Sequence, residues 1–330
     1  MRKEILAAAM SVIGAQAATY DLKATPENVV IGSYWSETKP AIKVQSGDTV
    51  VMHTISQSIG QGPKDVIGPG YDAIRNGVKD RGPGGHFLTG PVYVEGAEPG
   101  DVLEIRIQKI DMDIDYAQNN FGPTNGFLPE DFPYRGGKQL KLDRKRKVAI
   151  FNDKIEVPLH PFFGSMGVAP PEASGRLSSA PPWIQAGNLD NKDLVTGSTI
   201  YIPVHAPGAL FEVGDGHAGQ GDGEVDITAL ETSLVGTFQL IVRKDMHLRW
   251  PRAETPTHYI TMGLNEDLNA CTALALREMI DYLMTEKRLS RDDAYMLASV
   301  AGDLHITQLV DGNKGVHMML PKAIFLGATK

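Results

Sequence analysis

Apolar residues alternate with polar ones along most of this chain, and this spacing limits what the chain can fold into. In residues 103–107 and 200–204 every second residue is leucine, isoleucine or valine. A period of two places such side chains on one face of a β-strand. The 35 glycines and 21 prolines leave little room for long helices. We therefore predict a mainly β protein with β-sandwich or jelly-roll-like and barrel-like sheets.

Helical spacing occurs only near the C-terminus. Apolar residues between Leu268 and Leu283 follow one helix face, and we expect this helix to begin behind an Asn265 cap and to end near Glu286. A second helix is predicted to begin at Ser290, whose hydroxyl can cap it. We accordingly divide the chain into a segment 1–17, an N-terminal β domain 18–150, a central β domain 151–250 and a C-terminal α+β segment 251–330 that packs on the β core.

Residues 1–17 resemble a secretory signal, with a short basic start, an apolar stretch and a small-residue ending that would be cleaved after Ala17. A signal of this kind predicts export to a periplasm or secretion. If the segment instead stays in place as an N-terminal helix, the protein is cytoplasmic. No later segment is apolar for long enough to span a bilayer. The single cysteine, Cys271, lies in an apolar run, which predicts a packed thiol and excludes an intrachain disulfide.

The charge balance excludes one class of partner. With 40 acidic and 32 basic residues the net charge is −8, which disfavours binding to nucleic-acid phosphates. The basic run at 138–150 alternates with apolar residues and is typical of a solvated strand edge. We expect no nucleic-acid partner. Exposed sheet edges and the late helices favour a homo-oligomer, a dimer or larger.

The segment 214–225, GDGHAGQGDGEV, is the best candidate for a catalytic centre. It contains two aspartates, a histidine, a glutamine and a glutamate among five glycines, directly after an apolar run. Carboxylates and imidazole bind divalent cations, and glycines let the backbone fold tightly enough for neighbouring side chains to converge on one ion. The alternative interpretation is a polar, glycine-rich connection between two strands.

Five ordered segments resemble the acetamidase/formamidase family, whose members are metal-associated amidases distinct from the serine-based amidases. The resemblance extends from about Pro26 onward and rests on segments 82–105, 160–171, 185–204, 208–225 and 289–311. It implies a mainly β protein with helices near its C-terminus that hydrolyses small amides, such as formamide or acetamide, to the carboxylate and ammonia. Some members of this family act on γ-lactams and other cyclic amides, so the resemblance implies a cyclic amide as the alternative substrate.

An unactivated amide needs a strong nucleophile, stabilisation of the oxyanion and a proton donor. A divalent metal supplies the first two, because zinc lowers the pKa of a bound water to about 7 and polarises a carbonyl oxygen. We assign Asp215 and His217 to metal binding and Glu224 to general base and acid catalysis, and Asp222 is able to exchange roles with either acid. Zinc is the metal that we favour.

A catalytic zinc needs about three protein ligands, so a second segment must contribute. His86 is the first choice for a distant ligand, followed by Asp190 and Glu95, each of which could instead support a ligand or a loop. Asn188 could donate a hydrogen bond to the oxyanion. The density of carboxylates also leaves room for a second, harder ion such as calcium.

Other mechanisms have weaker support. The chain has no GxSxG motif and no glycine- and serine-rich nucleophile segment, and Cys271 lies in an apolar helix face. The alternative from another class is a noncatalytic β protein of the cell envelope that binds a metal or a small ligand.

Overall fold

The computed structural model describes residues 17–56, 70–112 and 114–326 of the chain. The predicted signal segment lies outside these residues except for Ala17, so export remains a prediction. Within the described residues none of the helices combines the length and the apolar character needed to cross a membrane.

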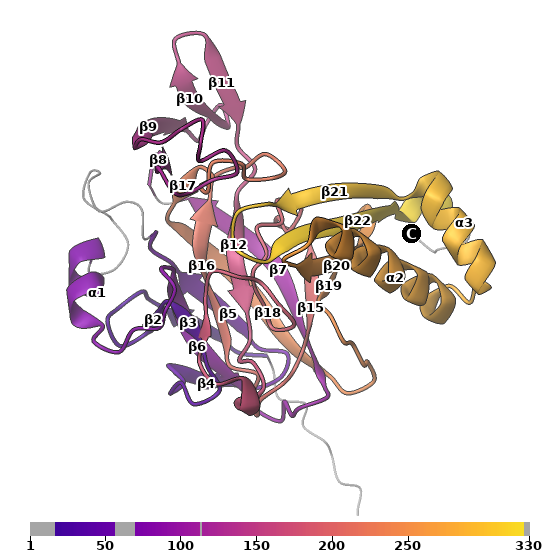
Figure 1. Cartoon of the computed structure of the whole chain (residues 1–330). Helices are drawn as coiled ribbons and strands as arrows, with labels where there is room; N and C mark the ends of the chain where they lie inside the picture. The colour runs from indigo at the N-terminus through magenta and orange to yellow at the C-terminus, as the bar shows by residue number, and fades with distance from the viewer. Residues whose placement is uncertain (1–16, 57–69, 113, 327–330) are drawn as a thin grey trace, which may run out of the picture.

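Two large sheets form the body of the protein (Figure 1). The nine-stranded sheet contains, in spatial order, β1 (Thr19–Leu22), β5 (Thr49–His53), β18 (Leu234–Arg243), β7 (Val102–Met112), β15 (Thr199–Pro203), β19 (Arg252–Glu254), β20 (His258–Asn265), β22 (Lys314–Pro321) and β21 (Asp303–Gln308). Strands from all three predicted segments share this sheet, so these segments fold together.

The eleven-stranded sheet carries several of the site residues predicted from the sequence, among them Asn188, Asp215 and His217. Its main path contains β11 (Ile155–Pro158), β10 (Val148–Asn152), β9 (Gly136–Asp143), β8 (Tyr116–Phe121), β17 (Glu231–Thr232), β16 (Phe211–His217), β12 (Phe162–Gly167) and β14 (Ala186–Asn188). Strand β6 (Phe87–Val94) pairs with β16 and also with β2 (Val29–Ile31) and β4 (Ile42–Val44). A separate pair joins β3 (Ser33–Tyr34) to β13 (Leu177–Ser178). Strand β16 therefore lies between β12, β6 and β17.

The main core lies between the two sheets. The largest cluster of buried apolar side chains combines Ile105 and Phe238 of the first sheet with Phe163, Phe211 and Val213 of the second. The two packed sheets confirm the prediction of a mainly β protein. The two helices predicted near the C-terminus are also present. Among the described strands no sheet closes on itself, so the barrel-like part of the prediction is not seen.

Three α-helices occur in the described residues: α1 (Tyr71–Gly77), α2 (Leu268–Glu286) and α3 (Arg291–Ala301). Short 3-10 turns occur at Glu172–Ser174 and Lys322–Ile324. The sequence analysis did not predict α1. It correctly predicted the end of α2 and the Ser290 cap of α3, whose hydroxyl accepts from the Asp293 backbone N–H.

The predicted cap of α2 was wrong by two residues. Asp267 caps the helix by accepting from the Ala270 N–H, whereas the Asn265 side chain accepts from the Asp267 N–H and forms the turn before it. The buried face of α2 also includes Cys271 and Ala275, two small residues that let the helix approach β20 closely. The prediction that Cys271 is a packed thiol is confirmed.

Gly263 on β20 lies against the backbone of α2. A Cβ added there would overlap the Cys271 carbonyl oxygen and lie 2.7 Å from the Ala275 nitrogen, both of them backbone atoms of α2. We expect Gly263→Ala to lower the free energy of unfolding by about 1–3 kcal/mol, because overpacking displaces the helix. Denaturant unfolding measures this change. Gly85→Ala, whose added Cβ meets no heavy atom within 4 Å, is the matched control and should change stability little. Equal stability of the two variants would contradict this packing.

Candidate functional site

The candidate site is built around His217, the last residue of β16. The imidazole is fully buried, and the Phe162 ring on β12 stands against it edge-on with centroids 5.0 Å apart. His217 pairs in register with Glu231 of the neighbouring strand β17. Because directly paired residues of antiparallel strands project to the same face, this register places Glu231 beside the imidazole. The sequence analysis did not identify Glu231.

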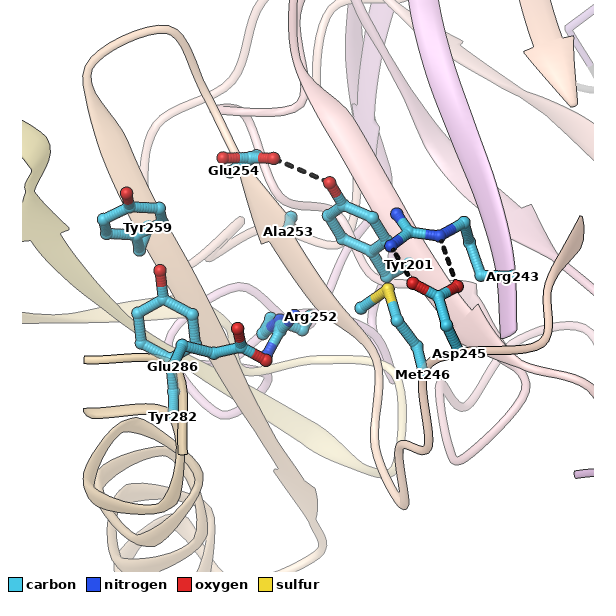
Figure 2. A pocket seen from close by; sticks show the side chains of 10 residues that line it. All are labelled: Tyr201, Arg243, Asp245, Met246, Arg252, Ala253, Glu254, Tyr259, Tyr282 and Glu286. Atoms are coloured by element: carbon cyan, nitrogen blue, oxygen red, sulfur yellow. Dashed lines mark hydrogen bonds and ion pairs between the residues drawn. The ribbon is translucent and has the colours of Figure 1, made fainter. Parts of the chain in front are cut away.

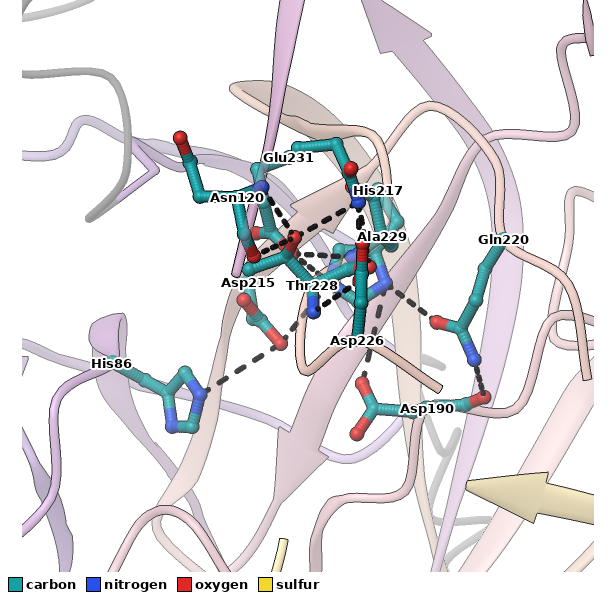
Figure 3. Close-up of polar contacts among 11 residues, drawn as sticks. His86, Asn120, Asp190, Asp215, His217, Gln220, Asp226, Thr228, Ala229 and Glu231 are labelled. Atoms are coloured by element: carbon teal, nitrogen blue, oxygen red, sulfur yellow. Dashed lines mark hydrogen bonds and ion pairs between the residues drawn. The ribbon is translucent and has the colours of Figure 1, made fainter. Parts of the chain in front are cut away.

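Acidic oxygens and a second imidazole surround the Nε2 side of His217 (Figure 3). Nε2 lies 3.3 Å from Asp215 Oδ2 and 3.3 Å from Glu231 Oε1. His86, directly before β6, points its Nε2 at Asp215 Oδ2 from 3.9 Å. The structure thus brings three predicted ligands, His86, Asp215 and His217, together with Glu231.

Gln220 fixes which nitrogen of His217 faces this group. The Gln220 side-chain nitrogen donates to the Asp190 backbone carbonyl at 3.0 Å, which leaves Oε1 to face His217 Nδ1 at 3.0 Å. Since Oε1 can only accept, Nδ1 carries the proton and donates to it. Nε2 therefore has a free lone pair in the neutral imidazole, which is the arrangement found in metal-bound histidines.

A second group of carboxyls lies on the other side of His217. One ligand atom each from Asp190, His217 and Glu224 falls within 4.8 Å of the others, and the Asp190 carboxyl also interacts with Asp311. Asp190 follows β14, where its backbone N–H donates to the Gly164 carbonyl of β12. Asp311 comes from the turn between β21 and β22. The sequence analysis did not identify Asp311, although this residue ends the segment 289–311 that carries part of the family resemblance.

Gly164 leaves the space in which these groups meet. A Cβ added at this residue would overlap Asp190 Oδ1 and would lie 2.5 Å from Asp215 Oδ2 and 2.8 Å from His217 Cε1. Any larger residue on this part of β12 would fill the centre of the cluster. Because Gly164 has no side chain, space for a small ion remains among these donor atoms.

The electrostatics of the cluster favour a positive charge at its centre. Burial lowers the pKa of His217, but the charges of Glu231 and Asp215 outweigh this effect and raise it well above its usual value. Burial raises the pKa of Asp311 to about 6. It also raises the pKa of Glu224 well above its usual value, and the charge of Asp311 adds to the increase. Buried carboxylates at this density need a cation or shared protons.

Unpartnered atoms test whether a divalent cation fits. Although His217 Nε2 and Glu231 Oε1 are close, their alignment is not that of a hydrogen bond. His217 Nε2, Glu231 Oε2, both Asp190 oxygens and Asp311 Oδ2 are buried without a hydrogen-bond partner among the described residues. Leaving such groups unpaired costs about 1–3 kcal/mol each. Two imidazoles and several carboxylates are the donors that zinc prefers, so the residues fit such an ion.

Three of the acids have an uncommon backbone conformation. The φ angles are 51° at Asp190, 55° at Asp215 and 43° at Glu224, all in the left-handed region. Non-glycine residues in this region are uncommon and tend to occur at functional sites. Backbone hydrogen bonds from the Asp190 N–H to the Gly164 carbonyl and from the Glu224 N–H to the Gly221 carbonyl help to hold two of these conformations.

A cavity of about 470 Å³ lies beside the cluster, and Glu224 and Gln220 form part of its wall. Phe151, Val157 and Leu230 supply apolar lining, and His160 also borders it. Glu224 therefore lies between the cavity and the candidate metal ligands.

The structure does not bring every predicted residue to the cluster. Asp222 instead faces Lys192 and His305, and the half-exposed Glu95 lies on the surface 4.0 Å from Lys43. Asn188 lies on β14 opposite Ser165, and its Oδ1 is buried without a hydrogen-bond partner among the described residues.

A second cavity of about 300 Å³ lies between β15, β19 and α2 (Figure 2). The polar groups in it already pair with one another: the Tyr201 hydroxyl donates to Glu254 at 2.6 Å, and Arg243 binds Asp245. This pairing leaves little for a ligand, and the His217 cluster is the better candidate.

Several known proteins are similar to this chain. The model of the acetamidase/formamidase family matches residues 23–180 and 173–326. The chain is similar to the crystal structure of an acetamidase from Bacillus halodurans, with 32% identity, a TM-score of 0.81 and coverage of 93% of this chain and 100% of that one. For an acetamidase from Yersinia enterocolitica the identity is 27%, the TM-score is 0.82, and 94% of each chain is covered. An acetamidase of Mycolicibacterium smegmatis is 27% identical over 241 residues, which cover 53% of this chain and 56% of that protein.

Gly164→Ala tests the geometry of the cluster. The added methyl group would meet the ends of the Asp190, Asp215 and His217 side chains, which can move without unfolding β12. We expect metal affinity to fall by about 10–100-fold, the range typical of changes that disturb metal ligands. Titration against a competing chelator measures the affinity, and circular dichroism checks the fold. Gly219→Ala, whose Cβ meets nothing closer than 3.4 Å, should bind metal normally. An unchanged affinity in Gly164→Ala would place the metal elsewhere.

Proposed function

We propose that this chain, which belongs to the acetamidase/formamidase family, uses a metal-activated water to hydrolyse small carboxamides to a carboxylate and ammonia. Membership follows from the family match, which covers almost the whole described chain, and confirms the resemblance seen in the sequence. The family and the named relatives support amidase activity in general. The metal mechanism and the roles of individual residues are our proposal.

One observation carries the mechanism. His217 Nε2, Asp215 and Glu231 converge within hydrogen-bonding distance, His86 faces Asp215, and Nε2 has no hydrogen-bond partner in the part of the chain that the structure describes. These four side chains would hold the ion. When bound, a divalent cation at this place lowers the pKa of water and polarises an amide carbonyl.

Glu224 is the proton carrier of the proposal. Its carboxyl lies within 4.8 Å of the Asp190 and His217 donor atoms, and its other side borders the cavity. From this position it can accept a proton from the attacking water and deliver it to the departing nitrogen. Burial keeps bulk water away from this transfer. Asn188, two residues before Asp190, remains the candidate donor to the carbonyl oxygen.

The two sides of His217 suit different ions. The Nε2 side offers imidazole nitrogens from His86 and His217 beside two carboxylates, which favours zinc. The side with Asp190, Glu224 and Asp311 is rich in oxygen, which suits a harder ion such as calcium. We propose zinc as the catalytic ion and retain calcium as a second one.

A cyclic amide is the second candidate substrate. The cavity of about 470 Å³ is larger than formamide or acetamide needs, and apolar side chains line part of it. A γ-lactam ring would therefore fit. Ammonia release separates the two possibilities, because opening a lactam leaves the nitrogen in the product.

Metal removal tests the proposal. We expect dialysis against a chelator to abolish ammonia release from formamide and acetamide, and added zinc to restore it, because the residues named above cannot activate water alone. Ammonia release is measured together with elemental analysis of the same samples. Full turnover in protein free of metal would contradict the mechanism. A noncatalytic binding protein would release no ammonia at any metal content.

Two substitutions separate metal binding from proton transfer. We expect Glu224→Gln to keep its metal while kcat falls by about 10²–10⁴-fold, the usual contribution of a general base. His217→Ala should lose the metal and the activity together. Metal content and kcat are measured for both. The matched controls are Glu95→Gln and His247→Ala, since both side chains lie away from the cluster. A Glu224→Gln enzyme with normal kcat would remove Glu224 from this role.

A further inference from the structure

The cavity beside Glu224 is bounded on one side by apolar side chains of the hairpin formed by β10 and β11. Phe151 of β10 and Val157 of β11 line it together with Leu230, which directly precedes β17. Leu230 belongs to a buried apolar cluster that includes Leu142, and Val157 packs against the same cluster. This apolar wall is therefore the open side of a packed cluster, whose neighbours keep its shape.

Lys138 of β9 holds the Phe151 ring in place. The Lys138 Nζ lies 4.1 Å from the ring centroid and donates to the Phe151 backbone carbonyl at 2.9 Å. Lys138 is not among the described residues that line the cavity, so it orients the ring without adding a positive charge to the wall. Phe151 and Val225 both remain exposed. Exposed apolar side chains gathered at a cavity are typical of a ligand-binding site.

The polar side chains of the cavity are already paired with one another. Asn119 Nδ2 donates to Thr228 Oγ1 at 3.0 Å and to Asp226 Oδ1 at 3.2 Å. The Thr228 hydroxyl also accepts from the Asn120 N–H and donates to the Asn120 carbonyl, so its hydrogen-bonding capacity is fully used. A ligand in the cavity must therefore be bound mainly through the apolar wall.

The charge around the cavity disfavours an anionic ligand. Asp222, Glu224 and Asp226 line it, and none of the described lining residues is a lysine or an arginine. Lys192 pairs with Asp222 from outside this lining. A carboxylate on the ligand would meet like charge without a cation to pair with, which is costly. The apolar wall and the surrounding acids together favour an uncharged ligand.

We propose that this chain prefers an uncharged primary amide whose acyl group is apolar and larger than that of acetamide, such as a medium-chain fatty amide or an arylacetamide. This inference rests on the proposed amidase function. The amide lies at Glu224 and the candidate metal ligands, and the acyl group lies along Phe151, Val157 and Leu230. Cleavage of the C–N bond by one water gives the carboxylic acid and ammonia. A volume of about 470 Å³ lies in the range of sites that enclose ligands larger than acetamide.

A series of amides tests the inference, with ammonia release measured on the metal-loaded wild-type enzyme. From acetamide through butyramide to hexanamide we expect kcat/KM to rise by about fourfold per methylene until the cavity is filled, the gain from burying one methylene. The rise should appear mainly as a lower KM, because the acyl group is bound equally in the ground and transition states. Isocaproamide and succinamate have the same shape, but succinamate ends in a carboxylate. Its kcat/KM should be at least about tenfold lower.

Two substitutions in the hairpin test where the acyl group lies. Val157→Phe fills the cavity, and Phe151→Ser removes the aromatic part of its wall. In each variant the ratio of kcat/KM for hexanamide to that for acetamide should fall by about tenfold, the usual effect of a changed apolar pocket. Ile155→Ser is the matched control, because this exposed residue of the same hairpin is not one of the described lining residues. It should keep the wild-type ratio, and circular dichroism checks the fold of all three variants.

A second copy of this chain is the other occupant that the apolar wall could have. In that case Phe151→Ser would lower the oligomeric state measured by light scattering and leave the substrate ratio unchanged, which overturns the inference. Equal kcat/KM values from acetamide to hexanamide would also overturn it, while the proposed amidase function would stand. Metal-loaded protein that releases no ammonia from any of these amides would contradict the proposed function itself.

Discussion

The interaction on which this structure depends is the meeting of buried negative charge with a positive centre at His217. The carboxyls of Asp190, Asp215, Glu224, Glu231 and Asp311 approach one imidazole in a region from which water is largely excluded. Burying ionised carboxylates is expensive unless a cation or shared protons accompany them. The raised pKa values of His217 and Glu224 express the same cost. Acids buried at this density stay together only with a cation or shared protons among them, and the donor set suits a divalent metal.

The sheet supplies the positions that such a centre needs. Strand β16 lies between β12, β17 and β6, so each neighbour can present a residue to the end where His217 lies. Glu231 arrives through cross-strand register, and Gly164 on β12 leaves the space. His86 precedes β6, which pairs with β16 at Leu88 and Gly214. Of the candidate metal ligands, strands hold Asp215, His217 and Glu231, and His86 directly precedes a strand, whereas loops hold Asp190, Glu224 and Asp311.

The sequence predicted the part of the site that is local. Asp215, His217 and Glu224 lie within ten residues, so composition and glycine spacing were enough to find them, and the alternating pattern was enough for the mainly β fold. Glu231 was missed because only the register of β17 brings it to His217, and such pairing leaves no local motif. Asp311 lies in a hairpin turn 94 residues after His217, and its role depends on how that hairpin folds back. Glu95 looked equally acidic in sequence, but the turn after β6 directs it to Lys43 at the surface.

Asp222 shows most clearly where local reasoning ends. It is two residues from Glu224, and in a regular extended strand both carboxylates would share one face and be interchangeable. The backbone between them is not extended: φ is 98° at Gly223 and 43° at Glu224, and the first of these values is accessible mainly to glycine. This turn sends Asp222 toward His305 while Glu224 reaches Asp190. One short loop thus divides its acids between two clusters, with Glu224 among the acids around His217 and Asp222 beside Lys192 and His305. Because Lys192 and His305 hold Asp222, the positions open to Glu224 are limited, and the placement of this proposed proton carrier depends on contacts outside the His217 cluster.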